Sequence, residues 1–260
     1  MRFAELLSIE GRKFLASRVA WSVTAVLAAM PLLAALGIVS IMSPGGSERL
    51  RLVALKMAVL GITIDWPGYL MMLMQTTATL GVLVHAITVG FVFGREYAEG
   101  TVPVLFTLPV PRHEVVGAKL AVVTLWFALA ITAMIGVGLA VGTRLDLPGF
   151  TDTVIADGLR DNAIVAGLTA LQAPVIALAT TASRSSLVSV GLGIALLYGS
   201  VAVGATPFGP YLPWAAVAQF AGIDGIRLPE IAPGSLAMCV AFSGGGLAAL
   251  LAHVRHADVA

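Results

Sequence analysis

The chain has 260 residues, of which 58% are hydrophobic and only 11% are charged. A soluble domain carries about 25% charged residues, so this composition excludes a soluble protein and indicates a membrane protein. The 28 glycines follow no triplet period and there is a single cysteine, which excludes collagen-like and disulfide-stapled classes. The net charge of +1 leaves no large basic patch, so no nucleic acid is expected as a partner.

The first segment, residues 2–17, is predicted to form an amphipathic helix. At 100° per residue, Phe3, Leu7 and Phe14 fall on one side of the helix, and polar residues lie opposite. Such a helix lies on the inner leaflet of the bilayer. The alternative interpretation is a frayed, charged tail.

Six apolar stretches follow, each long enough for the roughly 20 residues that a helix needs to cross a bilayer core. Because they are apolar all round and do not alternate with polar residues, they indicate helices and not barrel strands. The predicted fold class is therefore an all-α integral membrane protein, with residues 1–260 as a single transmembrane domain. The predicted spans are residues 19–41, 69–93, 120–141, 163–181, 187–205 and 234–251.

The distribution of lysine and arginine predicts the orientation, because these residues are more frequent in cytoplasmic loops. With the N-terminus inside, nine of the fifteen basic residues lie on the cytoplasmic side and six lie outside. Both termini are therefore expected in the cytoplasm, in a multi-pass protein.

The second span carries a narrow stripe of small and polar residues, Thr77, Gly81, His85 and Thr88. An ionisable side chain inside a span is costly and is a candidate for function. His85 is therefore expected either to line a translocation path or to hydrogen-bond within the helix bundle.

Glycine and proline mark further features of the spans. Gly138 and Gly142, spaced as GxxxG, and the glycine run at residues 244–246 predict close helix contacts. Pro31 and Pro174 are expected to kink the first and fourth spans, because proline removes a backbone hydrogen bond and clashes with the preceding turn.

Two outer segments are distinctive. Residues 207–233 combine aromatic side chains with four prolines and are too apolar for an ordinary loop. They are predicted to re-enter the membrane under a cover of protein, since re-entrant backbone needs such cover; an interfacial aromatic belt without re-entry is the alternative. Residues 142–162 are predicted to form an acidic outer loop.

Residues 94–118 join the second and third spans on the cytoplasmic side and are the most informative stretch of the sequence. They contain REYAEGT at 95–101, then a short apolar run, and LPVPR at 108–112. An apolar segment exposed to the cytoplasm needs a partner. Pro111 suits the first turn of a new helix, which runs through Lys119 into the third span.

These motifs, together with Lys119, closely resemble the pattern in the permease subunits of ABC-2 type transporters, also called type V exporters. Two residues depart from the pattern: Pro103 stands where many members have a basic or aliphatic residue, and Pro111 where serine or threonine is common. The resemblance implies an elbow helix at residues 2–17, six spans, a coupling helix at about residues 98–108 and a re-entrant segment at 207–233.

The resemblance also implies where a nucleotide-binding subunit docks. Arg95 and Glu96 are expected at the membrane surface, paired with the elbow helix or with the ATPase, and the turn around Arg184 is expected to be a second contact. The residues expected to contact the ATPase are Arg95, Glu96, Glu99, Gly100, Thr101, Leu105, Phe106, Pro109, Arg112 and Arg184.

In this family, spans two and five border the central cavity. The residues expected to line the translocation path are Thr77, Gly81, His85, Thr88 and Tyr198. The sequence has no G-x-x-x-x-G-K-[ST] motif, so ATP must be hydrolysed by a separate polypeptide. The chain is expected to bind no metal or cofactor itself; ATP and Mg²⁺ are expected in two partner ATPase subunits, with a second permease subunit completing a homodimer or heterodimer.

The predicted function is the permease subunit of an ATP-binding cassette exporter in a bacterial plasma membrane. Its expected substrate is a drug, a peptide antibiotic or a lipid-like molecule. H-E-x-x-H and G-x-S-x-G motifs are absent and the spans hold no paired carboxylates, so no enzyme is predicted. The alternatives are an ATP-independent secondary carrier or channel with His85 as a proton site, and a scaffold that transports nothing.

Overall fold

The computed structural model describes residues 3–42, 52, 55, 62–101, 110–204, 206, 208–223, 227–228 and 230–256. Within these residues the regular secondary structure is entirely helical. The stretches that are long and apolar enough to cross a membrane are Arg18–Met42, Trp66–Ala98, Arg112–Gly142, Asp152–Ser183, Ser186–Gly204 and Pro233–His256. The all-α fold with six candidate spans is therefore confirmed, and the chain is a multi-pass membrane protein.

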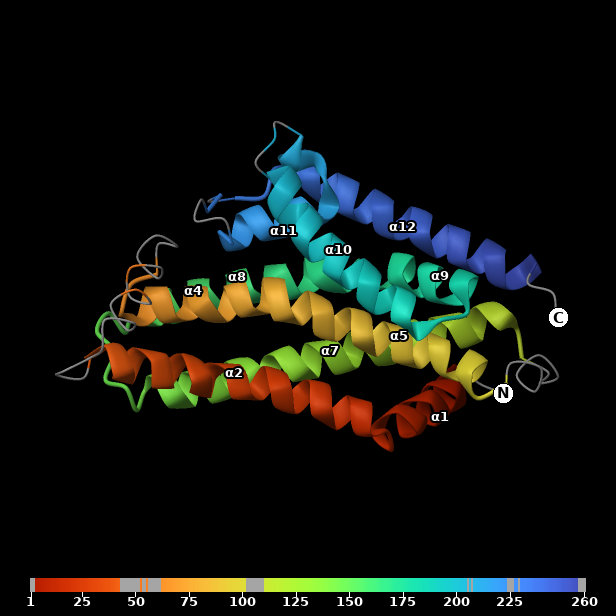
Figure 1. Ribbon diagram of the computed structural model, residues 1–260, viewed down its shortest axis with the longest axis horizontal. Helices are drawn as coiled ribbons and strands as arrows, with labels where there is room; N and C mark the ends of the chain where they lie inside the picture. The colour runs from red at the N-terminus through yellow and green to blue at the C-terminus, as the bar shows by residue number, and fades with distance from the viewer. Residues whose placement is uncertain are drawn as a thin grey trace.

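The helices run side by side along the long axis of the molecule (Figure 1). Helix α1 (Phe3–Leu15) and the end of α12 (Pro233–His256) lie at the same end, which we call the proximal end. The start of α4 (Trp66–Thr76) and the helix α11 (Pro213–Ala221) lie toward the opposite, distal end. An even number of spans places both chain ends on the same side of a bilayer.

Helix α1 packs against α7 (Arg112–Gly142) and α2 (Arg18–Met42). Its buried side chains are Leu6, Glu10 and Phe14, so the buried face is shifted from the predicted stripe, and Phe3 stays half exposed. Phe14 meets the ring of Trp126 edge-on, with 5.4 Å between the ring centroids. This contact holds the end of α1 against α7.

The second span is the most buried of the six and is built from three pieces: α4, a π-helical turn η1 (Thr77–Gly81) and α5 (Val82–Ala98). Helix α4 begins where the Asp65 carboxylate accepts a 2.8 Å hydrogen bond from the amide of Gly68, which satisfies a free amide of the first turn. Single π-turns inside an α-helix are rare and are frequent at functional sites.

The helix of the fourth span begins at Asp152, eleven residues before the predicted apolar stretch of residues 163–181. Helix α8 (Asp152–Ala170) is capped by the Thr151 hydroxyl, which accepts from the amide of Val154. The predicted acidic loop is therefore helical from Asp152 onward, because a search for apolar runs does not see the polar extension of a span. A break at residues 171–172 separates α8 from α9 (Ala173–Ser183), with Pro174 in the first turn of α9; α2 instead runs through Pro31 without interruption.

Helix α10 (Ser186–Gly204) leads to the 3-10 turn η2 (Gly209–Tyr211) and to α11, which is largely buried. Hydrogen bonds tie the α11 region to three spans: Gln75 donates to the carbonyl of Gly222, Gln219 donates to that of Gly204, and Cys239 donates to that of Pro213. Helix α11 is thus covered by protein, whereas Phe208 and Tyr211 before it stay exposed.

Glycines set several close helix contacts. A Cβ on Gly138 or on Gly142 would meet the side chain of Leu73 or Trp66 at 2.6 Å, so this predicted GxxxG pair does pack closely against α4. In the glycine run of α12, Gly246 contacts Val175, whereas Gly244 and Gly245 face open space.

Candidate functional site

The REYAEGT motif forms the proximal end of α5. Gly100 adopts a left-handed conformation with φ of +66°, the amide of Thr101 donates to the carbonyl of Glu96 over 2.9 Å, and the amide of Gly100 donates to that of Tyr97 over 3.3 Å. These two bonds make a Schellman cap, which satisfies the last carbonyls of a helix and requires a residue that tolerates positive φ. The EGT half of the motif is therefore a helix stop.

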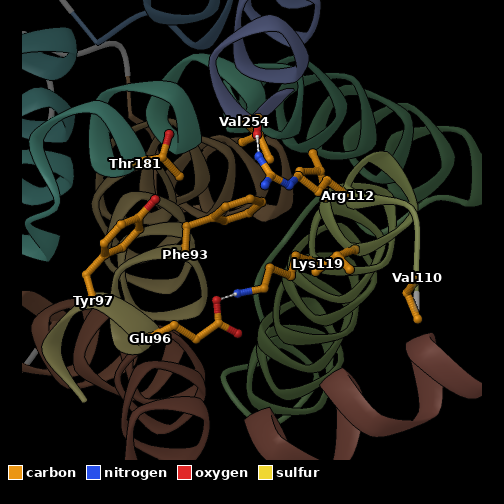
Figure 2. A pocket seen from close by; sticks show the side chains of 10 residues that line it. Phe93, Glu96, Tyr97, Val110, Arg112, Lys119, Thr181 and Val254 are labelled. Carbon is orange, nitrogen blue, oxygen red and sulfur yellow. Dashed lines mark hydrogen bonds and ion pairs between the residues drawn. The ribbon is translucent and has the colours of Figure 1, made fainter. Parts of the chain in front are cut away.

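Glu96 faces the interior and does not lie at the surface. Its carboxylate accepts a 2.5 Å hydrogen bond from Nζ of Lys119 (Figure 2). The same Nζ also donates to the carbonyl of Val92 over 2.9 Å. The Lys119 Nζ lies 5.5 Å from the centroid of the Phe93 ring. Because both charged groups are buried and paired, they join α5 to α7 at the proximal end.

Arg95 contacts the elbow-like helix α1, as expected from its place in the motif. Its guanidinium donates to the carbonyl of Lys13 over 3.4 Å and lies 3.3 Å from the carboxylate of Glu99. The group is also 5.9 Å from the centroid of the Phe91 ring. One residue thus links the end of α5 to the end of α1.

Arg112 begins α7 and holds the end of α12. Its Nη1 donates to the carbonyl of Val254 over 2.8 Å (Figure 2). It also donates to the carbonyl of Arg255 over 3.3 Å. A cation at these carbonyls is favourable, because the last carbonyls of a helix carry partial negative charge. Pro111 precedes the helix as its N-cap, one position before the predicted first turn.

These side chains surround a cavity of about 100 Å³ at the proximal end. Phe93, Thr181 and Val254 line it from three different helices, together with the Glu96–Lys119 pair and Arg112 (Figure 2). Val110, which follows residues 102–109 in the sequence, also lines the cavity. The cavity is the place where α5, α7, α9 and α12 meet.

The remaining residues of the predicted ATPase contact are placed as follows. Glu99 and Thr101 are exposed beside the helix stop, and Arg184 is exposed in the left-handed turn between α9 and α10. Leu105, Phe106 and Pro109 lie outside the described residues.

The polar stripe of the second span is buried within the subunit. The hydroxyl of Thr77 donates to Oδ1 of Asn162 over 2.8 Å, which ties the π-turn to α8. The hydroxyl of Thr88 donates to the carbonyl of Val84 in its own helix. Gly81 packs against side chains of α7, next to the ring of Phe127. The stripe therefore packs against α7 and α8 in this subunit.

His85 is fully buried, and its ring lies 4.6 Å from that of Phe127 between centroids. The Ala170 carbonyl is near the ring, yet within the described part of the chain neither ring nitrogen has a hydrogen bond of normal geometry. Both expected roles of His85, lining a translocation path or bonding within the bundle, stay predictions. Tyr198, by contrast, is 71% exposed on α10 and faces away from the subunit.

Two contacts of the site were not predicted from the sequence. Glu96 and Lys119 both belong to the recognised motifs, but the sequence did not predict that they pair with each other. Asn162 was counted with the outer loop, so its bond to Thr77 had no sequence signal.

Comparison with known proteins was then informative. The family described as ABC-2 family transporter protein matches the chain over residues 6–201. The bacitracin transport permease protein BCRB of Bacillus licheniformis is 25% identical over 181 residues, which are 69% of this chain and 86% of that protein. No solved structure matches the chain.

Proposed function

Because the chain belongs to the ABC-2 family of transporter proteins, we propose that it is the membrane subunit of an ATP-driven exporter that removes a peptide antibiotic from the cell. The substrate class rests on the similarity to a bacitracin transport permease. The protein itself is a transporter subunit and carries out no bond chemistry; ATP and Mg²⁺ bind to separate ATPase subunits, since its sequence has no P-loop motif.

The observation that carries the proposal is the set of contacts around residues 102–109 at the proximal end. Before this segment in the sequence, Arg95 donates a hydrogen bond to α1 and Glu96 pairs with Lys119. After it, Arg112 donates a hydrogen bond to the end of α12. A force that an ATPase applies to the described residues on either side of this segment reaches α1, α5, α7 and α12 through these contacts. This is the arrangement that a coupling element needs, because it converts a local displacement into a movement of whole spans.

The proximal end faces the cytoplasm in this proposal, and the membrane is the bacterial plasma membrane. The basic residues of the described chain concentrate there, in agreement with the positive-inside rule. The basic residues at this end are Arg12, Lys13, Arg18, Arg95, Arg112, Lys119, Arg184 and Arg255. Helix α1 then lies on the inner leaflet as an elbow helix, and α11 re-enters the membrane from the outer side.

Two such subunits and two ATPases form the working transporter. Tyr198 and the outward face of α10 meet the second permease subunit, as the same chain or a related one, and border the path between them. Closing of the ATPase dimer on ATP shifts the pair from an inward-facing to an outward-facing state, because the ATPases bind nucleotide more tightly when closed. Thr77, Gly81, His85 and Thr88 support this path from behind and are not exposed to it in the isolated subunit.

The proposal is tested in a bacitracin-sensitive host that expresses the chain with its ATPase. Expression should raise the bacitracin concentration that inhibits growth, and an ATPase variant unable to hydrolyse ATP should abolish the increase. Unchanged bacitracin sensitivity would reject the peptide-antibiotic substrate, and an increase that does not depend on ATP hydrolysis would reject the ATP-driven mechanism.

A further inference from the structure

A second cavity, of about 740 Å³, lies near the distal end, remote from the coupling segment. Its walls come from α8, α11 and the start of α12, through Ile164, Leu168, Phe220, Ile231 and Leu236. The volume is in the range of ligand sites, which is about 300–1,000 Å³.

The cavity exists because the fourth and sixth spans separate toward this end. Helix α12 packs closely on α9 below the break at residues 171–172, and α11 fills only part of the space between α8 and α12. Small residues on the open face of α8 widen it: Ala163 and Gly167 are exposed, and a Cβ on Gly167 would meet no atom within 4 Å.

The depth of the cavity matches one leaflet. Counting about 20 helical residues from Arg184 at the proximal boundary places the other boundary of the hydrocarbon core near Ala163. Gly167 and Leu171 then lie at acyl-chain depth, and Arg160 lies about one turn above, among the headgroups. The rise from Ala163 to Leu171 is roughly 12 Å, most of one half of a core about 30 Å thick.

Among the described residues that line the cavity, one charge of each sign is unpaired. Asp161 is paired with Arg227. Arg160 and Glu230 line the same cavity, and neither forms an ion pair or a hydrogen bond within the described residues. A guanidinium is suited to a phosphate, and a carboxylate to a primary ammonium.

We propose that this cavity binds a phospholipid of the outer leaflet whose headgroup carries both a phosphate and a primary ammonium, that is, phosphatidylethanolamine. The phosphate lies at Arg160, the ammonium lies at Glu230, and an acyl chain follows α8 past Gly167 to Leu171. The site is separate from the coupling segment and from the path along α10, so the bound lipid is a structural ligand of the fourth and sixth spans.

Native mass spectrometry of the protein from mild detergent, after exchange with phosphatidylethanolamine, phosphatidylglycerol or phosphatidylcholine, tests the proposal without ATP or a transport substrate. Phosphatidylethanolamine should be retained most strongly. Gly167→Leu, which has room on the backbone but fills the cavity, should abolish its retention, whereas Gly136→Leu, at a lipid-facing position of α7 that is equally open, should not. Equal retention by both variants would overturn the proposal.

The two charges are tested separately. Arg160→Gln should weaken retention of phosphatidylethanolamine and phosphatidylglycerol alike, by about tenfold for one charge-assisted contact. Glu230→Gln should weaken phosphatidylethanolamine alone. Stronger retention of phosphatidylglycerol than of phosphatidylethanolamine, or cross-linking of two subunits through Gly167→Cys, would overturn the proposal by showing an anionic lipid or a second copy of the chain in the cavity.

Discussion

Nζ of Lys119 lies 2.5 Å from Oε2 of Glu96, and both side chains are almost completely buried between α5 and α7. Residues 102–109 lie between these two helices in the sequence. The pair therefore fixes the spacing of the second and third spans at the point where a force from the ATPase would enter. In the proposed exporter this pair would transmit force, and it is the strongest polar link between the two helices in the described structure.

Removing one partner of this pair should be costly. Lys119→Met leaves the Glu96 carboxylate buried and unpaired, and Glu96→Gln leaves an unpaired ammonium; each should reduce the free energy of unfolding by about 3–5 kcal/mol. Thermal unfolding in detergent measures this loss.

The double variant with Glu96→Leu and Lys119→Met separates stability from coupling. Apolar residues of similar volume often replace a buried ion pair without loss of stability, so this variant should unfold near the wild-type temperature. Transport per ATP hydrolysed should nevertheless fall, because the link between α5 and α7 no longer resists displacement. Wild-type coupling in the double variant would show that the pair only stabilises the fold.

The helix stop at Gly100 gives a second prediction. Gly100→Ala forces an L-residue into a left-handed conformation with φ of +66°, which costs about 1–2 kcal/mol. The helix stop directly before residues 102–109, where the ATPase is proposed to dock, should then be disturbed. The ATPase should therefore copurify in reduced amount. Gly11→Ala, at an open position of α1, is the matched control and should leave copurification unchanged.

The contact of α5 with α10 gives a third. A Cβ on Gly193 would lie 2.6 Å from Cβ of Ala86, whereas one on Gly191, two residues earlier, would meet nothing within 4 Å. Gly193→Ala should therefore destabilise the protein by about 1–3 kcal/mol through overpacking, and Gly191→Ala should be neutral or slightly stabilising. Similar unfolding temperatures for the two variants would contradict the close packing of spans two and five.

A substitution of His85 distinguishes the proposed ATP-driven exporter from the alternative of an ATP-independent carrier. Within the described residues its buried ring nitrogens form no hydrogen bond of normal geometry, so His85→Leu removes a poorly satisfied polar group and should be neutral or stabilising. ATP-driven export should continue in this variant. Loss of transport, together with loss of a proton-driven component in vesicles with an imposed pH gradient, would favour the carrier.

The sequence predicted the fold well where apolar length decides the structure. All six spans could be found, because about 20 apolar residues have few alternatives to crossing a bilayer. It predicted less where polar residues extend a span: α8 starts at Asp152, since Thr151 caps it, and hydropathy does not register a cap. The π-turn at Thr77–Gly81 also left no sequence signal.

For the candidate site, the motif residues were found, but not all of their partners. Arg95 contacts α1 as expected, whereas Glu96 turns inward to Lys119. The difference arises because a carboxylate close to a buried ammonium gains more from pairing than from solvent at the membrane surface. Such a pairing depends on how two spans are rotated about their axes, and periodicity alone does not determine that rotation.

Purification of the tagged protein from its host in mild detergent, followed by measurement of ATP hydrolysis in the eluate, tests the central claim most directly. The account predicts that a P-loop ATPase copurifies, that the eluate hydrolyses ATP, and that Leu105→Asp in the coupling segment removes both the ATPase and the activity while the protein stays folded. A folded, dimeric preparation with no ATPase partner and no hydrolysis would contradict it.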